Sequence, residues 1–417
     1  MAEPTTLHAT PIPKRPGLSL ARIPKAVIFV FVFNAGCLLA NGAFLFLVPL
    51  LLLPSTRARE AYYEGIRYIK GAFASLMILM CQWFAPTKLS VTFEQTGQGR
   101  ITQKEIEDIV VRDAHGNVTM LNLPSKSVFI SNHQIYADWW YAWCFAYFMN
   151  AQRDVFIVLK KSLRWLPVVG WGMQFFRFIF LARSWASDRL QLATKLSELG
   201  REAQQEDKPF WFLLYPEGTV VSVNTRPVSK KFADKQGILD MTHVLLPRST
   251  GLHYSLRSLA PRLPKLKLID ATVVYPGIPS MKYGQDYYTL RSIFFNGVPP
   301  PVIHIHLRVF DVHTEVPIGD ISGSNPSVLP DTSPQNNTVE IDIPEIEKTR
   351  FDEWLRQLWR DKDAVMQSYY DTGSLSDDKL PAVVIPLKLR EKREYLDAFC
   401  FFLPAVVGSF LWSKLRL

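Results

Sequence analysis

Three polar residues near one another in the chain have types and a spacing that suit acid–base catalysis. Asn132 and His133 follow the apolar stretch SVFI, and Asp138 comes five positions after His133, where an aromatic stretch begins. Positions five apart lie about 140° apart on a helix, so this pair can meet only across a turn between a strand and a helix. A carboxylate on one imidazole nitrogen fixes the tautomer and leaves the other nitrogen to take a hydroxyl proton. The alternative is a structural histidine beside a helix cap.

A second polar group follows a long apolar run. The stretch KPFWFLLYPEGT ends in Glu217, Gly218 and Thr219. An almost continuous apolar run is typical of a strand that is covered on both faces of a sheet. Ligands bind at the carboxyl edge of open α/β sheets, so a carboxylate and backbone N–H groups here are candidates for a substrate site. An ordinary β-turn is the alternative.

These motifs, in this order, resemble the glycerolipid acyltransferase family, which includes the 1-acylglycerol-3-phosphate acyltransferases. The family pattern is N-H-x-x-x-x-D after a strand and P-E-G-T later in the chain. Its second block, a basic residue after an apolar strand, is similar to FIFLAR, which ends in Arg183. Its fourth block is similar to VVYPG, which contains Pro276. The segment from Lys160 to Trp171 resembles the stretch that precedes the second block.

Two further segments resemble one branch of that family, the lysocardiolipin and lysophosphatidylinositol acyltransferases. They are VLLPRSTG, which contains Arg248, and the late stretch WLRQLWRDKDAVMQSYYDTG. The resemblance covers residues 86–315 and 350–373. Four blocks in the same order make it specific, although each block alone is a weaker signal.

The resemblance implies direct acyl transfer, in which His133 deprotonates a glycerol hydroxyl that attacks an acyl-CoA thioester while Asp138 orients His133. It implies acyl-CoA as a co-substrate, no other cofactor, no metal, a lysophospholipid and a membrane as partners, and no nucleic acid. The mechanism needs no serine or cysteine nucleophile, and the chain contains no G-x-S-x-G motif. By the same resemblance the substrate-binding residues are Asn132, Lys160, Arg183, Glu217, Gly218, Thr219 and Arg248.

One position departs from the family pattern. Many relatives have an arginine after P-E-G-T that binds the substrate phosphate, and this chain has Val220 there. A phosphate monoester carries more charge than a diester, so losing an arginine weakens a monoester site most. We therefore expect a diester acceptor such as lysophosphatidylinositol. The alternatives are a 1-acylglycerol-3-phosphate acyltransferase and a catalytically silent lipid-binding protein, in which the basic residues are solvated surface charges.

Charge and hydropathy predict an integral membrane protein. The chain of 417 residues has a formal net charge of +9, which suits an anionic partner such as phospholipid headgroups. Residues 26–53 carry no charge and are long enough for a bilayer-spanning helix, the alternative being a buried helical hairpin. A shorter apolar run over 72–85 predicts an interfacial or re-entrant helix. The family resemblance places the protein in the endoplasmic reticulum.

Strands that alternate with helices predict an α/β fold with a mixed, largely parallel sheet flanked by helices, together with N-terminal membrane helices and a C-terminal apolar anchor. The predicted segments are a disordered basic N-terminus (1–25), membrane-associated helices (26–85), an acyltransferase domain (86–318), a disordered insertion (319–345), a helix completing that domain (346–375) and a tail with an apolar membrane segment (376–417).

Two weaker patterns favour structural roles. The four cysteines lie in apolar surroundings without metal-ligand spacing, which predicts free buried thiols. His304 and His306 alternate along a strand and could form a metal site with Asp311 and His313, but Arg308 on the same face favours an ordinary half-buried strand.

Overall fold

A computed structural model of the chain describes residues 4–17, 19–182, 184–321, 343–375 and 382–415. Eight strands form one mixed sheet in the order β10-β1-β9-β8-β4-β7-β5-β6. Their bounds are β1 (Lys88–Phe93), β4 (Lys126–Ser131), β5 (Val155–Lys160), β6 (Ile179–Leu181), β7 (Phe210–Leu214), β8 (Lys267–Val274), β9 (Ile303–Asp311) and β10 (Val383–Pro386).

Most neighbouring strands in this sheet run parallel. β4 is parallel to both β7 and β8, β5 is parallel to β7 and β6, and β1 is parallel to β9. Only the pairs β8–β9 and β1–β10 are antiparallel. The predicted α/β fold with a largely parallel sheet is therefore confirmed. The carboxyl ends of β4, β5, β7 and β8 lie at one edge of the sheet, which is the edge where such folds bind ligands.

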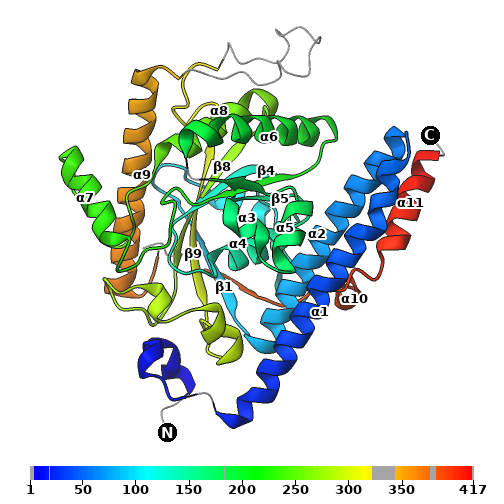
Figure 1. Cartoon of the computed structure of the whole chain (residues 1–417). Helices are drawn as coiled ribbons and strands as arrows, with labels where there is room; N and C mark the ends of the chain where they lie inside the picture. Colours follow the sequence, from blue (N-terminus) through cyan, green and yellow to red (C-terminus); the bar gives the residue numbers. More distant parts are fainter. Residues whose placement is uncertain (1–3, 18, 183, 322–342, 376–381, 416–417) are drawn as a thin grey trace.

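Helices lie on both faces of the sheet and beside it (Figure 1). They are α1 (Ile23–Leu47), α2 (Thr56–Phe84), α3 (Gln103–Ile109), α4 (Asp138–Phe148), α5 (Val169–Phe175), α6 (Trp185–Gln205), α7 (Arg226–Gln236), α8 (Ser249–Leu259), α9 (Glu345–Thr372), α10 (Glu394–Asp397) and α11 (Leu403–Leu415).

Alternate residues of the central strands face two separate apolar cores. In β7, Trp211 and Leu213 pack with α2 and α4, whereas Phe210 and Phe212 pack with α6, α8 and α9. Both faces of the strand are thus buried, as its continuous apolar sequence predicts. All four cysteines are free and buried, as predicted.

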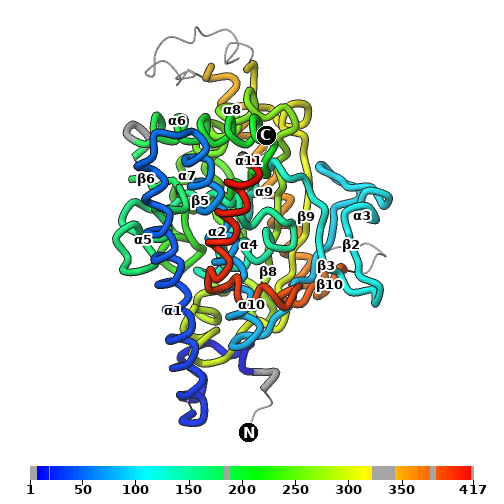
Figure 2. The backbone as a smooth tube through the Cα atoms, turned by 90° about the vertical axis from the view of Figure 1, so that its right-hand side faces the viewer, coloured from blue at the N-terminus to red at the C-terminus, as the bar shows by residue number. Residues whose placement is uncertain are grey.

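A two-stranded hairpin lies apart from the main sheet. β2 (Val110–Arg112) and β3 (Val118–Leu121) pair antiparallel around the turn at His115-Gly116-Asn117. Figure 2 shows this small sheet and α3 on the side of the molecule away from α1.

The N-terminal segment, which we expected to be disordered, has regular structure in part. Residues Pro4–Ala9 and Ile12–Lys14 form 3-10 turns, and the Arg15 guanidinium donates a hydrogen bond of 2.6 Å to the Tyr287 carbonyl. The segment is ordered because it packs on the loop after β8, a long-range contact that its composition does not reveal.

α1 is the one described helix that is long and apolar enough to cross a membrane, within the stretch Leu20–Leu52. The second apolar run does not form a separate interfacial or re-entrant helix. It is the C-terminal half of α2, whose residues 72–81 are all buried against protein. The prediction over 72–85 is therefore wrong, because the sheet and α4 cover this half of the helix.

Other boundaries also differ from the sequence prediction. Residues 238–248, inside the predicted acyltransferase domain, are irregular, and α8 begins at Ser249. α7 and β10 were not predicted. The apolar C-terminal stretch forms α11, which packs on α2 with Leu403 and Val407 buried, and no C-terminal anchor is shown. Most of the expected insertion, 322–342, lies outside the described residues.

Candidate active site

His133 and Asp138 form the hydrogen-bonded pair that their spacing predicts. His133 lies just beyond β4 and Asp138 is the first residue of α4, with a turn between them. The Nδ1 atom of His133 is 2.7 Å from Oδ2 of Asp138. Because a carboxylate accepts, Nδ1 carries the proton and Nε2 presents its lone pair.

Three further donors hold the Asp138 carboxylate. The backbone N–H groups of Gln134 and Ile135 donate to Oδ2 at 2.7 and 3.0 Å, and the Tyr275 hydroxyl donates to Oδ1 at 2.6 Å. The position at the N-terminus of α4 also favours negative charge. The carboxylate is 5% exposed. It is therefore fixed in an orientation that serves His133.

The imidazole ring of His133 lies between protein and solvent. It stacks on Tyr215, with ring centroids 4.2 Å apart and planes at 18°. The side chain is 17% exposed, and Nε2 makes no hydrogen bond to any residue that the structure describes. This nitrogen is consequently available to a substrate hydroxyl.

The P-E-G-T loop is joined directly to this pair. One carboxyl oxygen of Glu217 accepts the His133 backbone N–H at 3.1 Å, and the other accepts the Leu245 N–H at 3.2 Å. The Val221 N–H donates to the His133 carbonyl at 3.0 Å. Glu217 therefore connects three loops at the carboxyl edge of the sheet.

Burial changes the protonation of Glu217. The residue is 2% exposed, and desolvation raises the pKa of its carboxyl to about 8. The Leu245 and His133 N–H groups and the Lys362 ammonium favour the charged form but do not offset this cost. Near neutral pH the group is mostly protonated, so it joins the loops without placing a full charge beside Asp138.

Asn132 lies behind the pair. Its amide Nδ2 donates to the Val273 carbonyl and its Oδ1 accepts the Val273 N–H, each at 2.8 Å. The side chain is fully buried. Asn132 therefore ties the end of β4 to β8 and positions the turn that carries His133.

The predicted cationic residues are distributed along the same edge. Arg248 is exposed and lies over Gly218, whose φ of +72° is a conformation that favours glycine. No described residue forms an ion pair with Arg248. Lys160 is exposed at the end of β5, and Thr219 is half-buried in the loop. Arg183 lies outside the described residues.

Val220 is buried, with 4% of its surface exposed. The nearby Arg226 does not replace the arginine that many relatives have there. Its guanidinium donates to the carbonyls of Met241, Thr242 and Val244 at 2.7 to 3.0 Å, so it holds the loop before α8. Arg248 is consequently the exposed guanidinium beside Gly218.

The alternating histidines of β9 have protein partners. His306 contacts Thr92 at 3.1 Å and Glu94 at 3.4 Å, and His304 packs against Tyr369. Among the described residues no group of three or more His, Cys, Asp or Glu has the arrangement of a metal site.

The sequence did not reveal Tyr215 and Tyr275. Each ends an apolar strand directly before a proline, Pro216 or Pro276, and this position at a carboxyl edge is the signal that could have identified them. Their contacts with His133 and Asp138 depend on β7 and β8 both lying beside β4, which only the sheet order shows.

Comparisons with known proteins identify similar sequences. Residues 115–274 match the family model described as Acyltransferase. The chain is 33% identical over 380 residues to the 2-acyl-1-lysophosphatidylinositol acyltransferase of Saccharomyces cerevisiae, covering 84% of this chain and 85% of that protein. It is 30% identical over 247 residues to Lysocardiolipin acyltransferase 1 of Danio rerio, covering 59% of this chain and 53% of that protein. It is 29% identical over 205 residues to Lysophosphatidylinositol acyltransferase 10 of Caenorhabditis elegans, covering 48% of this chain and 49% of that protein. No solved structure matches the chain.

Proposed function

Because this chain belongs to the acyltransferase family, we propose that it transfers an acyl group from acyl-CoA to the free hydroxyl of a lysophospholipid. The observation that carries the proposal is the His133–Asp138 hydrogen bond of 2.7 Å, with Nε2 free of protein partners. A silent lipid-binding protein would not need a carboxylate with three further donors behind a partly exposed imidazole.

The chemistry requires one base and no covalent intermediate on the protein. His133 Nε2 takes the proton as the glycerol oxygen attacks the thioester carbonyl carbon, and Asp138 stabilises the imidazolium that forms. The tetrahedral oxyanion collapses, the C–S bond breaks, and the CoA sulfur receives the proton from His133. Backbone N–H groups stabilise the oxyanion.

Arg248 and Lys160 are the groups that we assign to substrate phosphate. Both are exposed at the carboxyl edge of the sheet, and Arg248 lies over Gly218 beside Glu217. Arginine matches the geometry of phosphate oxygens and remains charged at all relevant pH values. Two such cations suit the single charge of a phosphodiester.

The proposed acceptor is lysophosphatidylinositol. Relatives whose names specify lysophosphatidylinositol or lysocardiolipin are similar to this chain, and Val220 occupies the position at which many relatives have an arginine. With Val220 buried and Arg226 bound to three carbonyls, neither replaces that arginine, and its loss weakens a site for a doubly charged phosphate monoester more than one for a diester.

The membrane is the proposed location, through α1, and the proposed organelle is the endoplasmic reticulum. Large apolar side chains on α1 are exposed, including Phe31 at 73%, Leu38 at 53% and Leu45 at 67%. They are seven residues apart and therefore share one face of the helix. An exposed apolar stripe of this length suits lipid better than water.

A comparison of acceptors tests the proposal. Purified protein in detergent micelles is given one acyl-CoA and either lysophosphatidylinositol or lysophosphatidic acid, and CoA release gives kcat/KM for each. We expect a higher kcat/KM with lysophosphatidylinositol. A preference for lysophosphatidic acid would identify a 1-acylglycerol-3-phosphate acyltransferase, and no CoA release with any acceptor would support the silent lipid-binding protein.

A further inference from the structure

A cavity bordered by charged and aromatic side chains lies at the opposite edge of the sheet from His133. Its volume is about 60 Å³, and it is bordered by Asp154 and Pro209, which directly precede β5 and β7. His133 and Glu217 lie beyond the carboxyl ends of β4 and β7, so the cavity and the His133 site lie at opposite ends of the strands. Residues from α2 and α6 complete the cavity wall.

Lys70 of α2 is the unusual residue of this cavity. It is 2% exposed, and its Nζ atom lies 3.9 Å from the centre of the Phe156 ring. The structure gives this ammonium no hydrogen bond or ion pair with any described residue. A buried ammonium without an acceptor is costly, so its presence requires an explanation.

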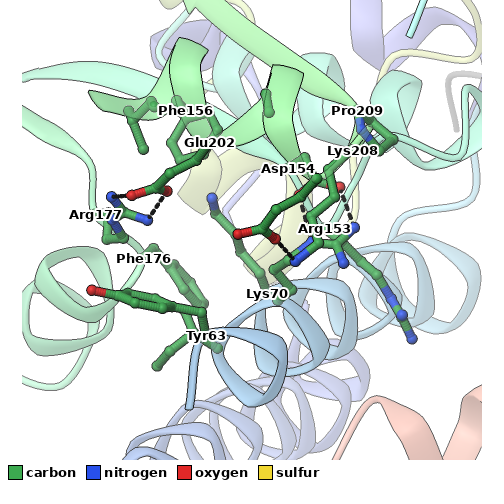
Figure 3. Close-up of a pocket in the computed structure, with 15 residues that line it drawn as sticks. Tyr63, Lys70, Arg153, Asp154, Phe156, Phe176, Arg177, Glu202, Lys208 and Pro209 are labelled. Atoms are coloured by element: carbon green, nitrogen blue, oxygen red, sulfur yellow. Dashed lines mark hydrogen bonds and ion pairs between the residues drawn. The ribbon is translucent and has the colours of Figure 1, made fainter. Parts of the chain in front are cut away.

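The carboxylates of the cavity are already engaged by other cations, Glu206 by Lys208 and the other two by arginines. Arg67 holds both oxygens of Asp154 at 2.7 and 2.8 Å, and Arg177 holds both oxygens of Glu202 at 2.7 and 3.0 Å. Figure 3 shows the Lys70 side chain between the Arg177–Glu202 pair and Asp154. Lys70 therefore remains as the cation without a counter-charge.

The surroundings also disfavour the charge on Lys70. Burial lowers the pKa of its ammonium to about 7; the charge of Asp154 opposes this, and those of Arg177 and Arg67 add to it. An anion in the cavity would favour the protonated amine by replacing its lost hydration.

We propose that this cavity is a second binding site, distinct from the acyl-transfer site, and that it takes a compact oxyanion of the phosphate type against Lys70. The volume accommodates roughly four to six water-sized atoms, as a tetrahedral group of four oxygens requires. Arg153 and Lys208 border the cavity but form ion pairs with Glu64 and Glu206, so the anion is held by Lys70. Phe156 and Phe176 offer an apolar wall for adjoining carbon atoms.

The bound group comes either from a phospholipid headgroup or from free phosphate. The cavity is bordered by the N-terminal half of α2, which follows α1 after the short 3-10 helix Val48–Leu52. A phospholipid headgroup at a membrane surface is therefore one source of the phosphate group. Binding would connect α2 to α6 and β5 and so stabilise the packing of α2 on the sheet.

The test measures the thermal midpoint of the full chain in neutral detergent micelles at constant ionic strength. Inorganic phosphate is one probe, and micelles that contain an anionic phospholipid are the other. We expect at least one probe to raise the Tm saturably, by about 2 °C at ten times its dissociation constant. If inorganic phosphate alone raises the Tm, the bound group is free phosphate. If the rise in Tm requires the anionic phospholipid, the bound group is its headgroup.

Two variants locate the effect. Lys70→Met keeps the length of the side chain without its charge and should abolish the shift, whereas Arg248→Gln, at the other edge of the sheet, should retain it. A shift that persists in Lys70→Met but is lost in Arg248→Gln would assign the anion to the acyl-transfer site and overturn the proposal. No Lys70-dependent shift with either probe would also overturn it.

A measurement on the unaltered protein covers the case in which Lys70→Met does not fold. An amine-acetylating reagent is applied with and without the effective probe, and peptide masses give the extent of labelling at each lysine. We expect the probe to slow labelling of Lys70 but not of Lys230, which is 65% exposed on α7. Equal labelling of Lys70 in both conditions would contradict the proposal.

Discussion

The Tyr275 hydroxyl donates a hydrogen bond of 2.6 Å to Oδ1 of Asp138, the carboxylate oxygen that His133 does not contact. Tyr275 follows β8, whereas His133 and Asp138 flank the turn after β4. The neighbouring strand therefore fixes the plane of the carboxylate, and through it the tautomer and direction of the imidazole.

Removing this hydroxyl should slow the chemical step. Hydrogen bonds to charged groups contribute about 1.5–3 kcal/mol, so we expect Tyr275→Phe to lower kcat by roughly tenfold or more while KM for the acceptor changes little. Steady-state CoA release at saturating acyl-CoA measures both constants.

Tyr288→Phe is the matched control. Tyr288 is equally buried and donates to the Pro276 carbonyl at 2.7 Å, but not to Asp138. Its kcat should stay near that of the wild type. Equal losses in the two variants would show that a general loss of packing, rather than orientation of Asp138, causes the effect.

The raised pKa of Glu217 should make the free energy of unfolding depend on pH. Its folded pKa of about 8 is above the ordinary value of 4.5, so the folded state binds more protons than the unfolded state between these pH values. The free energy of unfolding should therefore fall as pH rises, by up to roughly 1.4 kcal/mol per pH unit from this group. Well above pH 8, Glu217 is ionised in both states, and this group causes no further loss of stability.

Glu217→Gln removes this titration. The difference in unfolding free energy between the variant and the wild type should change between pH 5 and 8, in favour of the variant as pH rises. Denaturant unfolding at several pH values measures it. Parallel pH curves for the two proteins would show that burial does not raise the pKa of Glu217.

The sequence predicted the features that depend on neighbouring residues. The apolar stretch before Asn132 and the aromatic stretch after Asp138 predicted a strand, a turn and a helix, and hence the His133–Asp138 pair. The P-E-G-T loop was placed correctly at a strand end for the same reason.

Features that depend on distant contacts were not predictable in this way. The Glu217 carboxyl accepts hydrogen bonds from the His133 and Leu245 N–H groups. These contacts depend on the order of the strands in the sheet, and no local sequence pattern specifies that order. β10 was missed because it is a short edge strand paired with β1. α7 did have a local signal, Pro227 in its first turn and Gly237 with φ of +64° as its cap, and we overlooked it.

Arg248 should contribute to acceptor binding rather than to chemistry. Its exposed guanidinium lies beside Gly218 without an ion-pair partner among the described residues. We expect Arg248→Gln to raise KM for the lysophospholipid about tenfold or more with a smaller change in kcat. Arg112→Gln, on the distant β2–β3 hairpin, is the control and should leave both constants unchanged. An unaltered KM in Arg248→Gln would remove Arg248 from the phosphate site.

The exposed face of α1 should hold the protein in a membrane. A triple change of Phe31, Leu38 and Leu45 to Asp places three charges on that face and should release the protein into the alkaline carbonate supernatant. The same change at Val228, Phe232 and Leu239, exposed apolar residues in and just beyond α7, is the control and should leave it in the pellet. Release of the wild type by carbonate would contradict integral membrane attachment.

His133 is the proposed general base for acyl transfer, and the rate of purified His133→Ala tests this role most directly. A general base contributes roughly 10²–10⁴-fold, so CoA release should fall by that factor while the circular dichroism spectrum and thermal midpoint remain close to those of the wild type. His304→Ala, at a half-buried histidine of β9 away from the pair, should retain full activity. A folded His133→Ala protein that transfers acyl groups at the wild-type rate would contradict the account.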